Sequence, residues 1–213
     1  MRMPGDTIPV FPLDGALLLP HGRLPLNIFE PHYLAMVEDS LAAGRLIGMG
    51  QTNPNEPAGP TGPALYGVGC LGRIVSFSET DDGRILITLL GVSRFAIDAE
   101  VDMRRGYRRV QADTSRFADD LDLPGGGSGF DRAELLEALR GYFRTRGFDA
   151  NWDAIEQMED DALIVTLAMV CPFEPAEKQA LLEADTPADR AQVLLSLLKI
   201  DAYDQGGDRQ RAS

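Results

Sequence analysis

The chain of 213 residues carries a formal net charge of −13 and has a sequence pI near 4.5. Such an acidic protein repels phosphate backbones and anionic lipid, which argues against global attraction to nucleic acid or to membranes. Its hydrophobic content of 44% is sufficient for one large domain, or two small ones, with a buried core.

The two cysteines, Cys70 and Cys171, are too few for a disulfide framework and too far apart for a paired zinc site. We expect both to be buried, reduced thiols. The N-terminal stretch MRMPGDTIPV lacks the apolar region of a signal peptide, and the longest apolar run, ALIVTLAMVC, is far shorter than the roughly 20 residues of a membrane helix. A cytoplasmic protein without a membrane partner is therefore expected.

Up to about residue 113, the sequence predicts mainly β-strands separated by turns. Apolar segments alternate with breaks that contain proline or glycine, and TDDG at 80–83 is typical of a hairpin turn. The predicted strands cover residues 7–13, 23–29, 45–51, 64–79, 84–91, 93–101 and 107–113. Many short strands indicate an antiparallel barrel or sandwich rather than alternating β/α units.

One helix is predicted in this half, and it begins at the pair Glu30-Pro31. Proline at the first position of a helix loses no hydrogen bond, and apolar residues follow at helical spacing. Glu30, His32 and Tyr33 gather polar groups here, which we interpret as a structural corner rather than a catalytic cluster. Glu30 would accept hydrogen bonds from the helix N–H groups or pair with an arginine, while Phe29 and Tyr33 would lie in the core.

The second half predicts helices after an acidic and then glycine-rich linker, DDLDLPGGGSGF. Capping patterns predict helix starts at Asp131 and Thr186, and the nearly all-apolar segment 160–171 predicts a buried helix. The expected divisions are a β subdomain at 1–118, the linker at 119–130, a helical bundle at 131–204 and a disordered tail at 205–213.

The sequence offers little for catalysis. GVGCLG at 67–72 matches G-x-G-x-x-G, but a strand follows it where a dinucleotide site needs a helix, so these glycines are interpreted as strand bends. No G-K-[ST] or G-x-S-x-G motif occurs. The available bases are limited to His21, His32, Lys178 and Lys199. We expect no catalytic residue, no metal ligand set and no cofactor.

The segment RRGYRR at 104–109 is the only dense basic patch. Arginines interleaved with a tyrosine can hold phosphate or stack a base, so RNA binding is one interpretation. The favoured interpretation is an exposed hairpin tip whose charges balance an acidic protein. The arginines concerned are Arg104, Arg105, Arg108 and Arg109.

Several segments occur in an order and spacing that resemble the N-terminal, substrate-binding domain of the Lon protease family. They are PVFPL (9–13), LPLNIFEPHYLAMV (24–37), GVGCLGRI (67–74), DDGR (81–84), LLGVSRFAI (89–97) and LLEADTPADRAQVL (181–194). The resemblance covers roughly residues 7–200 and implies an α+β fold, a PUA-like antiparallel β-barrel of about six strands followed by an α-helical bundle. Its motif residues with structural roles are Phe29, Glu30, Tyr33, Gly69, Cys70, Arg94 and Phe95.

The resemblance also implies a role, because in the full protease this domain captures unfolded or tagged polypeptides and helps to assemble the ring. The 213 residues contain neither the ATPase module nor the Ser–Lys protease module. We therefore expect a non-enzymatic, stand-alone polypeptide-binding module, an adaptor or regulator of proteolysis with a protease subunit as a further partner. A monomer or weak dimer is expected. RNA binding, by analogy with other PUA-like barrels, is the alternative, and nucleic acid is the less favoured partner.

The segment ALYGVGCLGRIVSF is apolar on both faces of the predicted strand, so something must cover its outer face. The helical half is the expected cover, with a groove along the seam. Met49 and Tyr66 flank the long loop at 51–64 and are the predicted polypeptide contacts, since a flexible thioether suits varied partners.

Overall fold

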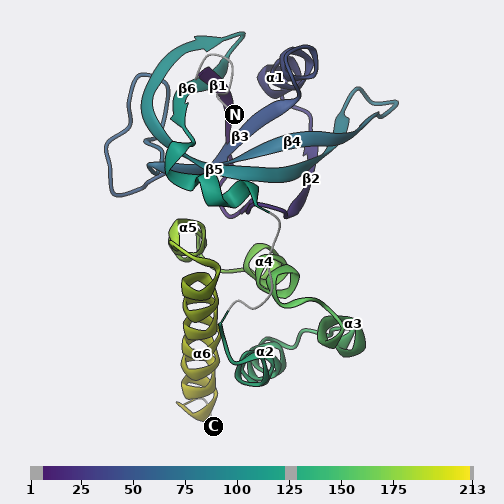
Figure 1. The fold of residues 1–213 in the computed structure, drawn as a ribbon, viewed down its shortest axis with the longest axis vertical. Helices are drawn as coiled ribbons and strands as arrows, with labels where there is room; N and C mark the ends of the chain where they lie inside the picture. Colours follow the sequence, from purple (N-terminus) through teal and green to yellow (C-terminus); the bar gives the residue numbers. More distant parts are fainter. Residues whose placement is uncertain (1–6, 123–128, 212–213) are drawn as a thin grey trace. The chain divides into compact units, whose positions relative to one another are not determined.

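The computed structural model describes residues 7–122 and 129–211, with side chains up to residue 201. The chain divides into two compact units, residues 1–123 and 124–213, which we call the N-terminal and C-terminal units (Figure 1). A 3₁₀ helix, η1 (Ser115–Leu121), closes the N-terminal unit, so the boundary predicted at residue 118 falls inside this helix. Residues 123–128 of the predicted linker lie outside the described residues.

The strands of the N-terminal unit follow the sequence pattern closely. They are β1 (Thr7–Pro12), β2 (Arg23–Ile28), β3 (Leu46–Gly50), β4 (Val68–Glu79), β5 (Ile85–Arg104) and β6 (Tyr107–Asp113), with α1 (Pro31–Ala42) between β2 and β3. The two strands predicted at 84–91 and 93–101 form one long strand, β5. Gly91 does not end that strand. Its lack of a side chain instead admits Leu19, whose carbonyl oxygen would lie 1.9 Å from a Cβ there.

The six strands form one curled sheet in the order β2-β5-β4-β3-β1-β6. β6 also pairs with the second half of β5, so the pairings return to that strand, and β2 is left as an edge (Figure 1). β1 and β3 are parallel, with Val10 opposite Gly48, because β2 and α1 intervene and return the chain in the same direction. The α+β class is confirmed, and the predicted antiparallel barrel is corrected to a mixed, curled sheet.

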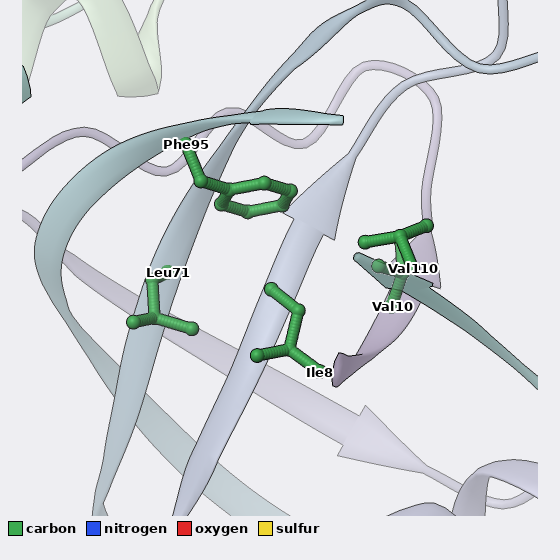
Figure 2. Close-up of a cluster of buried hydrophobic side chains, with 5 residues drawn as sticks. All are labelled: Ile8, Val10, Leu71, Phe95 and Val110. Atoms are coloured by element: carbon green, nitrogen blue, oxygen red, sulfur yellow. The ribbon is translucent and has the colours of Figure 1, made fainter. Parts of the chain in front are cut away.

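The core of the N-terminal unit gathers side chains from four strands. Figure 2 shows this cluster, in which the ring of Phe95 lies among aliphatic side chains; its members are Ile8, Val10, Leu71, Phe95 and Val110. Glycine makes room for the ring, since a Cβ on Gly48 would lie 2.9 Å from Cζ of Phe95. A side chain there would displace the ring from a closely packed interior.

The outer face of β4 is covered in part by a segment of the N-terminal unit itself. Leu17, Leu18 and Leu19 are buried, and a Cβ on Gly72 would lie 2.8 Å from Cδ2 of Leu18. The sequence pattern assigned this cover to the helical half. The leucine segment lies between β1 and β2 and has no strand or helix periodicity, which is why its role was not predicted.

At the start of α1, Pro31 occupies the first helical position, as predicted. The side chain of Glu30 makes no capping hydrogen bond; its Oε2 lies 3.7 Å from Nε2 of His32, so the expected helix cap or arginine partner is corrected. Tyr33 is half-buried against Phe11, but Phe29 is 62% exposed. The prediction of a core Phe29 is wrong because it follows buried Ile28 in an extended chain, where successive side chains face opposite sides.

The C-terminal unit is helical. Its helices are α2 (Arg132–Arg146), α3 (Trp152–Glu156), α4 (Asp160–Val170), α5 (Pro175–Glu183) and α6 (Pro187–Arg211). The predicted caps are confirmed: Asp131 accepts bonds from the N–H groups of Ala133 and Glu134, and Thr186 and Asp189 bond reciprocally. Among the described helices, none is long and apolar enough to span a membrane.

Two expectations for these helices need correction. α4 buries one face only: Val170, its last residue, is 72% exposed although the segment is apolar nearly all round. The tail predicted to be disordered from residue 205 begins inside α6, which extends to Arg211, and residues 212–213 lie outside the described residues.

Candidate functional site

The candidate bases lie on separate elements, which are a turn for His21, α1 for His32, α5 for Lys178 and α6 for Lys199. Residues 7–122 and 129–211 hold no group of three or more His, Cys, Asp or Glu side chains that could bind a metal ion. His21 lies in a turn with a φ of 66°, and Lys199 forms an ion pair with Glu134 at 2.6 Å. Lys178 is buried, and burial lowers its pKa. Both cysteines are buried, as expected, and neither forms a disulfide within the described residues.

The basic segment is a hairpin between β5 and β6 that binds α1. The guanidinium of Arg105 donates to Glu38 at 2.9 Å and to Asp39 at 3.1 Å, and Arg104 lies 3.1 Å from Asp39. The hydroxyl of Tyr107 donates to Asp39 at 2.7 Å. Burial and this bond to a carboxylate raise the pKa of Tyr107 to about 12. The hairpin therefore holds α1 to the sheet.

Arg108 differs from its neighbours because it is buried. Its guanidinium donates to Glu100 at 3.1 and 2.5 Å and to the Pro63 carbonyl at 2.8 Å. Thr61 donates to the same carboxylate. The prediction of an exposed tip is thus wrong for Arg108, which fixes the 51–64 loop to the sheet.

Each of the four arginines has an acceptor within the protein. For Arg109, the last of them, Nε donates to the Asp102 carbonyl at 3.0 Å. These contacts account for the basic segment as structure. They give RNA binding no supporting observation.

The two predicted polypeptide contacts occupy different environments. Met49 is 2% exposed within β3, opposite Cys70 of β4, so its thioether does not reach the surface. Tyr66 is half-buried just before β4, where its N–H donates to the Gln51 carbonyl at 3.0 Å. Only Tyr66 of the pair offers a surface side chain.

An apolar surface lies elsewhere in the N-terminal unit, over β2, β5 and the second half of β4. Leu86 of β5 is 44% exposed on the outer side, next to Ser78 of β4, whereas Phe77 of β4 lies opposite Ile87 and faces the other side of the sheet, where it is 42% exposed. A shallow hollow of about 390 Å³ opens here, which we call the β2–β5–β4 hollow; its lining is Pro25, Leu26, Asn27, Ser76, Phe77, Ser78, Leu86, Ile87 and Thr88. None of these side chains is charged, so the surface presents apolar groups, hydroxyls and an amide.

The strand geometry explains why this surface is apolar on its outer side. Along β5, Ile85, Ile87 and Leu89 are buried, whereas Leu86 and Thr88 face outward. The sequence RILITLLG is apolar at nearly every position and gives no sign of which side is covered. Sequence reasoning missed Leu86, and the apolar face on which it placed Phe77 is the side of the sheet opposite to Leu86.

Comparison with known proteins gives a family match over most of the chain. Residues 7–200 match the family described as ATP-dependent protease La (LON) substrate-binding domain. Lon protease 2 of Sorangium cellulosum is 27% identical over 198 residues, which is 91% of this chain and 24% of that protein. Lon protease of Parabacteroides distasonis is 31% identical over 94 residues, 44% of this chain and 11% of that protein. The chain spans at most about a quarter of the length of these relatives.

Solved structures share the fold. The Lon N-terminal domain protein from Xanthomonas campestris aligns with a TM-score of 0.61 and 22% identity, covering 89% of this chain and 97% of that one. The N-terminal domain of the Mycobacterium avium complex Lon protease gives the same TM-score at 17% identity, covering 90% and 97%. The likeness confirms the α+β fold over both units.

Proposed function

The chain belongs to the family of ATP-dependent protease La (LON) substrate-binding domains, and we propose that it binds unfolded or tagged polypeptides without catalysing a reaction on them. The observation that carries this proposal is the β2–β5–β4 hollow, an uncharged surface in which Leu86 is exposed. Contiguous exposed apolar surface is unfavourable in water and commonly marks a binding site.

The chemistry of the hollow suits a polypeptide without a fixed sequence. Its lining combines apolar side chains with Ser76, Ser78 and Thr88, which can bond to a peptide backbone in either direction. The absence of charge from the lining means that neither acidic nor basic clients are rejected there. An unfolded chain presents apolar side chains and free backbone groups together, so it complements both parts of the surface.

The proposal extends to an adaptor or regulator of proteolysis that delivers its client to a protease subunit. The family match supports it, because the relatives that share this domain are Lon proteases. A cytoplasmic location and a monomeric or weakly dimeric state belong to the same proposal. Tyr66 stays a proposed contact, whereas Met49 is set aside because it is buried.

The test is a binding measurement with an unfolded protein. The probe is a reduced, carbamidomethylated and fluorescently labelled model protein of near-neutral net charge, titrated with this chain at physiological salt. We expect the variant Leu86→Ser to bind roughly fivefold more weakly, because the exposed apolar contact of the hollow is lost. Met103→Ser is the control, since Met103 is 48% exposed on a different hairpin. Equal affinities for wild type and Leu86→Ser would overturn the assignment to this surface.

A further inference from the structure

We infer that the free edge of β4, Val75–Glu79, receives a client polypeptide as an added β-strand. The inference rests on the proposed function and deepens it, because it names the conformation of the client and the groups that recognise it. The recognised groups are the backbone amides of an extended segment rather than a particular side-chain sequence.

The edge exists because β4 extends beyond the residues that pair with β3. β4 pairs with β5 along its whole length, from Val68 to Glu79, but with β3 only from Cys70 to Arg73. Beyond a bulge near Val75, no described strand lies on the β3 side. The five residues from Val75 to Glu79 are all exposed.

The register shows which amides point outward. The N–H of Thr80 donates to the Arg84 carbonyl at 3.0 Å, so these residues form a hydrogen-bonded pair at the end of the β4–β5 hairpin. Hydrogen-bonded pairs alternate along an antiparallel ladder, so Ser78 and Ser76 also direct their amides to β5. Phe77 and Glu79 therefore direct their N–H and carbonyl groups to the free edge.

The other free edge of this three-stranded region, on β2, is blocked. The backbone groups of Leu86 and Thr88 in β5 bond to β4, so the backbone groups of the alternate β5 residues bond to β2. By the same alternation, the backbone groups of Arg23, Pro25 and Asn27 in β2 point away from β5, to the free edge. Proline has no N–H and is a common means of protecting an edge strand, whereas Val75–Glu79 contains no proline.

The side chains beside the β4 edge define the client further. Val75 and Phe77 are 39% and 42% exposed and offer apolar contact to alternate residues of an added strand. At the hairpin end, Glu79 and Asp81 are negative and exposed, while the neighbouring Asp82 pairs with Arg84 at 2.8 Å. Charge complementarity favours an extended segment with alternate apolar residues and a basic residue near one end.

Backbone recognition also explains selection for the unfolded state. In a folded protein nearly all amides are already bonded, so they cannot complete a new ladder. An extended, unfolded segment can do so whatever its sequence. The same edge would then serve many clients.

N-methylated peptides test the inference on the wild-type protein. The probe is a labelled short peptide of alternating valine and threonine that ends in arginine, prepared unmodified, with N-methyl groups on the valines, and with N-methyl groups on the threonines. Only one side of an added strand faces β4. We expect one methylated peptide to bind at least about tenfold more weakly, because several hydrogen bonds are lost, and the other to bind as the unmodified peptide does.

A matched pair of variants tests the edge from the protein side. Glu79→Pro removes one outward N–H, and Glu79→Ala removes the same carboxylate without removing that donor. We expect the proline variant to bind the unmodified peptide about fivefold more weakly than the alanine variant, which corresponds to one net hydrogen bond. Circular dichroism checks that the proline variant folds; if it does not, the methylated peptides decide alone.

The outcomes separate the two proposals. If neither the peptide nor the unfolded protein binds wild type, the proposed function itself fails. If the unfolded protein binds and both methylated peptides bind as the unmodified one does, polypeptide binding stands and strand addition is overturned. A further outcome is that wild type binds no peptide but self-associates in sedimentation, and that Glu79→Pro abolishes this self-association. The edge would then bind a second copy of the chain, and the inference would be overturned.

Discussion

The ring of Phe95 lies directly against the backbone of Gly69: a Cβ at position 69 would lie 2.5 Å from Cζ of Phe95 and 2.6 Å from the Met49 carbonyl oxygen. Phe95 is fully buried and belongs to the core cluster of Figure 2. The glycine that resembles part of a dinucleotide motif in the sequence is therefore required by packing between β4 and β5.

Gly69→Ala should destabilise the N-terminal unit by about 2 kcal/mol, because the added methyl group overpacks a rigid core. Urea unfolding followed by circular dichroism measures the change. Gly67→Ala is the matched control, since nothing lies within 4 Å of a Cβ at that exposed position, and it should change stability by less than about 0.5 kcal/mol. Equal effects at the two positions would contradict the packing explanation.

The end of the N-terminal unit can be tested through Arg94 and Asp120. Arg94 is buried, and its guanidinium and N–H bond to the Asp120 carboxylate of η1 at 2.9 and 2.8 Å. A fragment of residues 1–118 lacks this carboxylate, so it should be about 3 kcal/mol less stable than a fragment of residues 1–123. Urea unfolding of the two fragments gives the comparison.

Asp120→Asn in the full chain is the companion experiment, because it removes the charge without shortening the protein. It should lower the free energy of unfolding of the N-terminal unit by a smaller amount, about 2 kcal/mol, since the amide oxygen keeps part of the bonding. If the 1–118 and 1–123 fragments unfold at the same urea concentration, η1 does not belong to the folded unit.

Arg108 should hold the 51–64 loop. Arg108→Ala leaves Glu100 without its main partner and the Pro63 carbonyl without its donor, so we expect a loss of about 3 kcal/mol. Hydrogen exchange should also accelerate at Gly59 and Gly62, which form a bridge in the loop. Arg109→Ala is the control and should leave exchange in the loop unchanged, because Arg109 bonds to Asp102 instead.

Tyr107 should make stability fall at alkaline pH. Its pKa is about 12 in the folded protein, against 10.0 for the unperturbed side chain, because of burial and the bond to Asp39. The folded state holds the phenolic proton more tightly, so its contribution is complete below pH 10 and is lost as the pH rises to about 12. Tyr107→Phe should reduce the slope of stability against pH in this range. An unchanged slope in urea titrations would show that Tyr107 does not titrate in this way.

Much of the fold follows from local sequence patterns. The strands, the proline at the start of α1, and the caps at Asp131 and Thr186 depend on neighbours within a few positions. The two predicted strands at 84–91 and 93–101 were separated because glycine was interpreted as a break. In the structure Gly91 instead meets the Leu19 carbonyl, a contact that no local pattern contains.

The candidate site was predicted less well. Met49 and Tyr66 were chosen for their position beside a long loop, but burial in β3 removes Met49 from the surface. Phe77 was recognised as lying on an apolar face, yet Leu86 was not, because β5 is apolar at nearly every position. Which apolar side chains stay exposed depends on what packs over them, and periodicity does not give that.

The sequence by itself determined most of the order of strands and helices, the two-part composition and the family, because these reside in local patterns and in motifs of fixed order. Only the tertiary structure decided that Leu18 covers one part of β4 while Phe77 stays exposed on another, and that Arg108 is buried among basic residues that are not. The physical reason is that burial and strand pairing join residues far apart in the chain. The open edge of β4 exists because its pairing with β3 ends at Arg73. The sequences of the two strands do not indicate where that pairing ends.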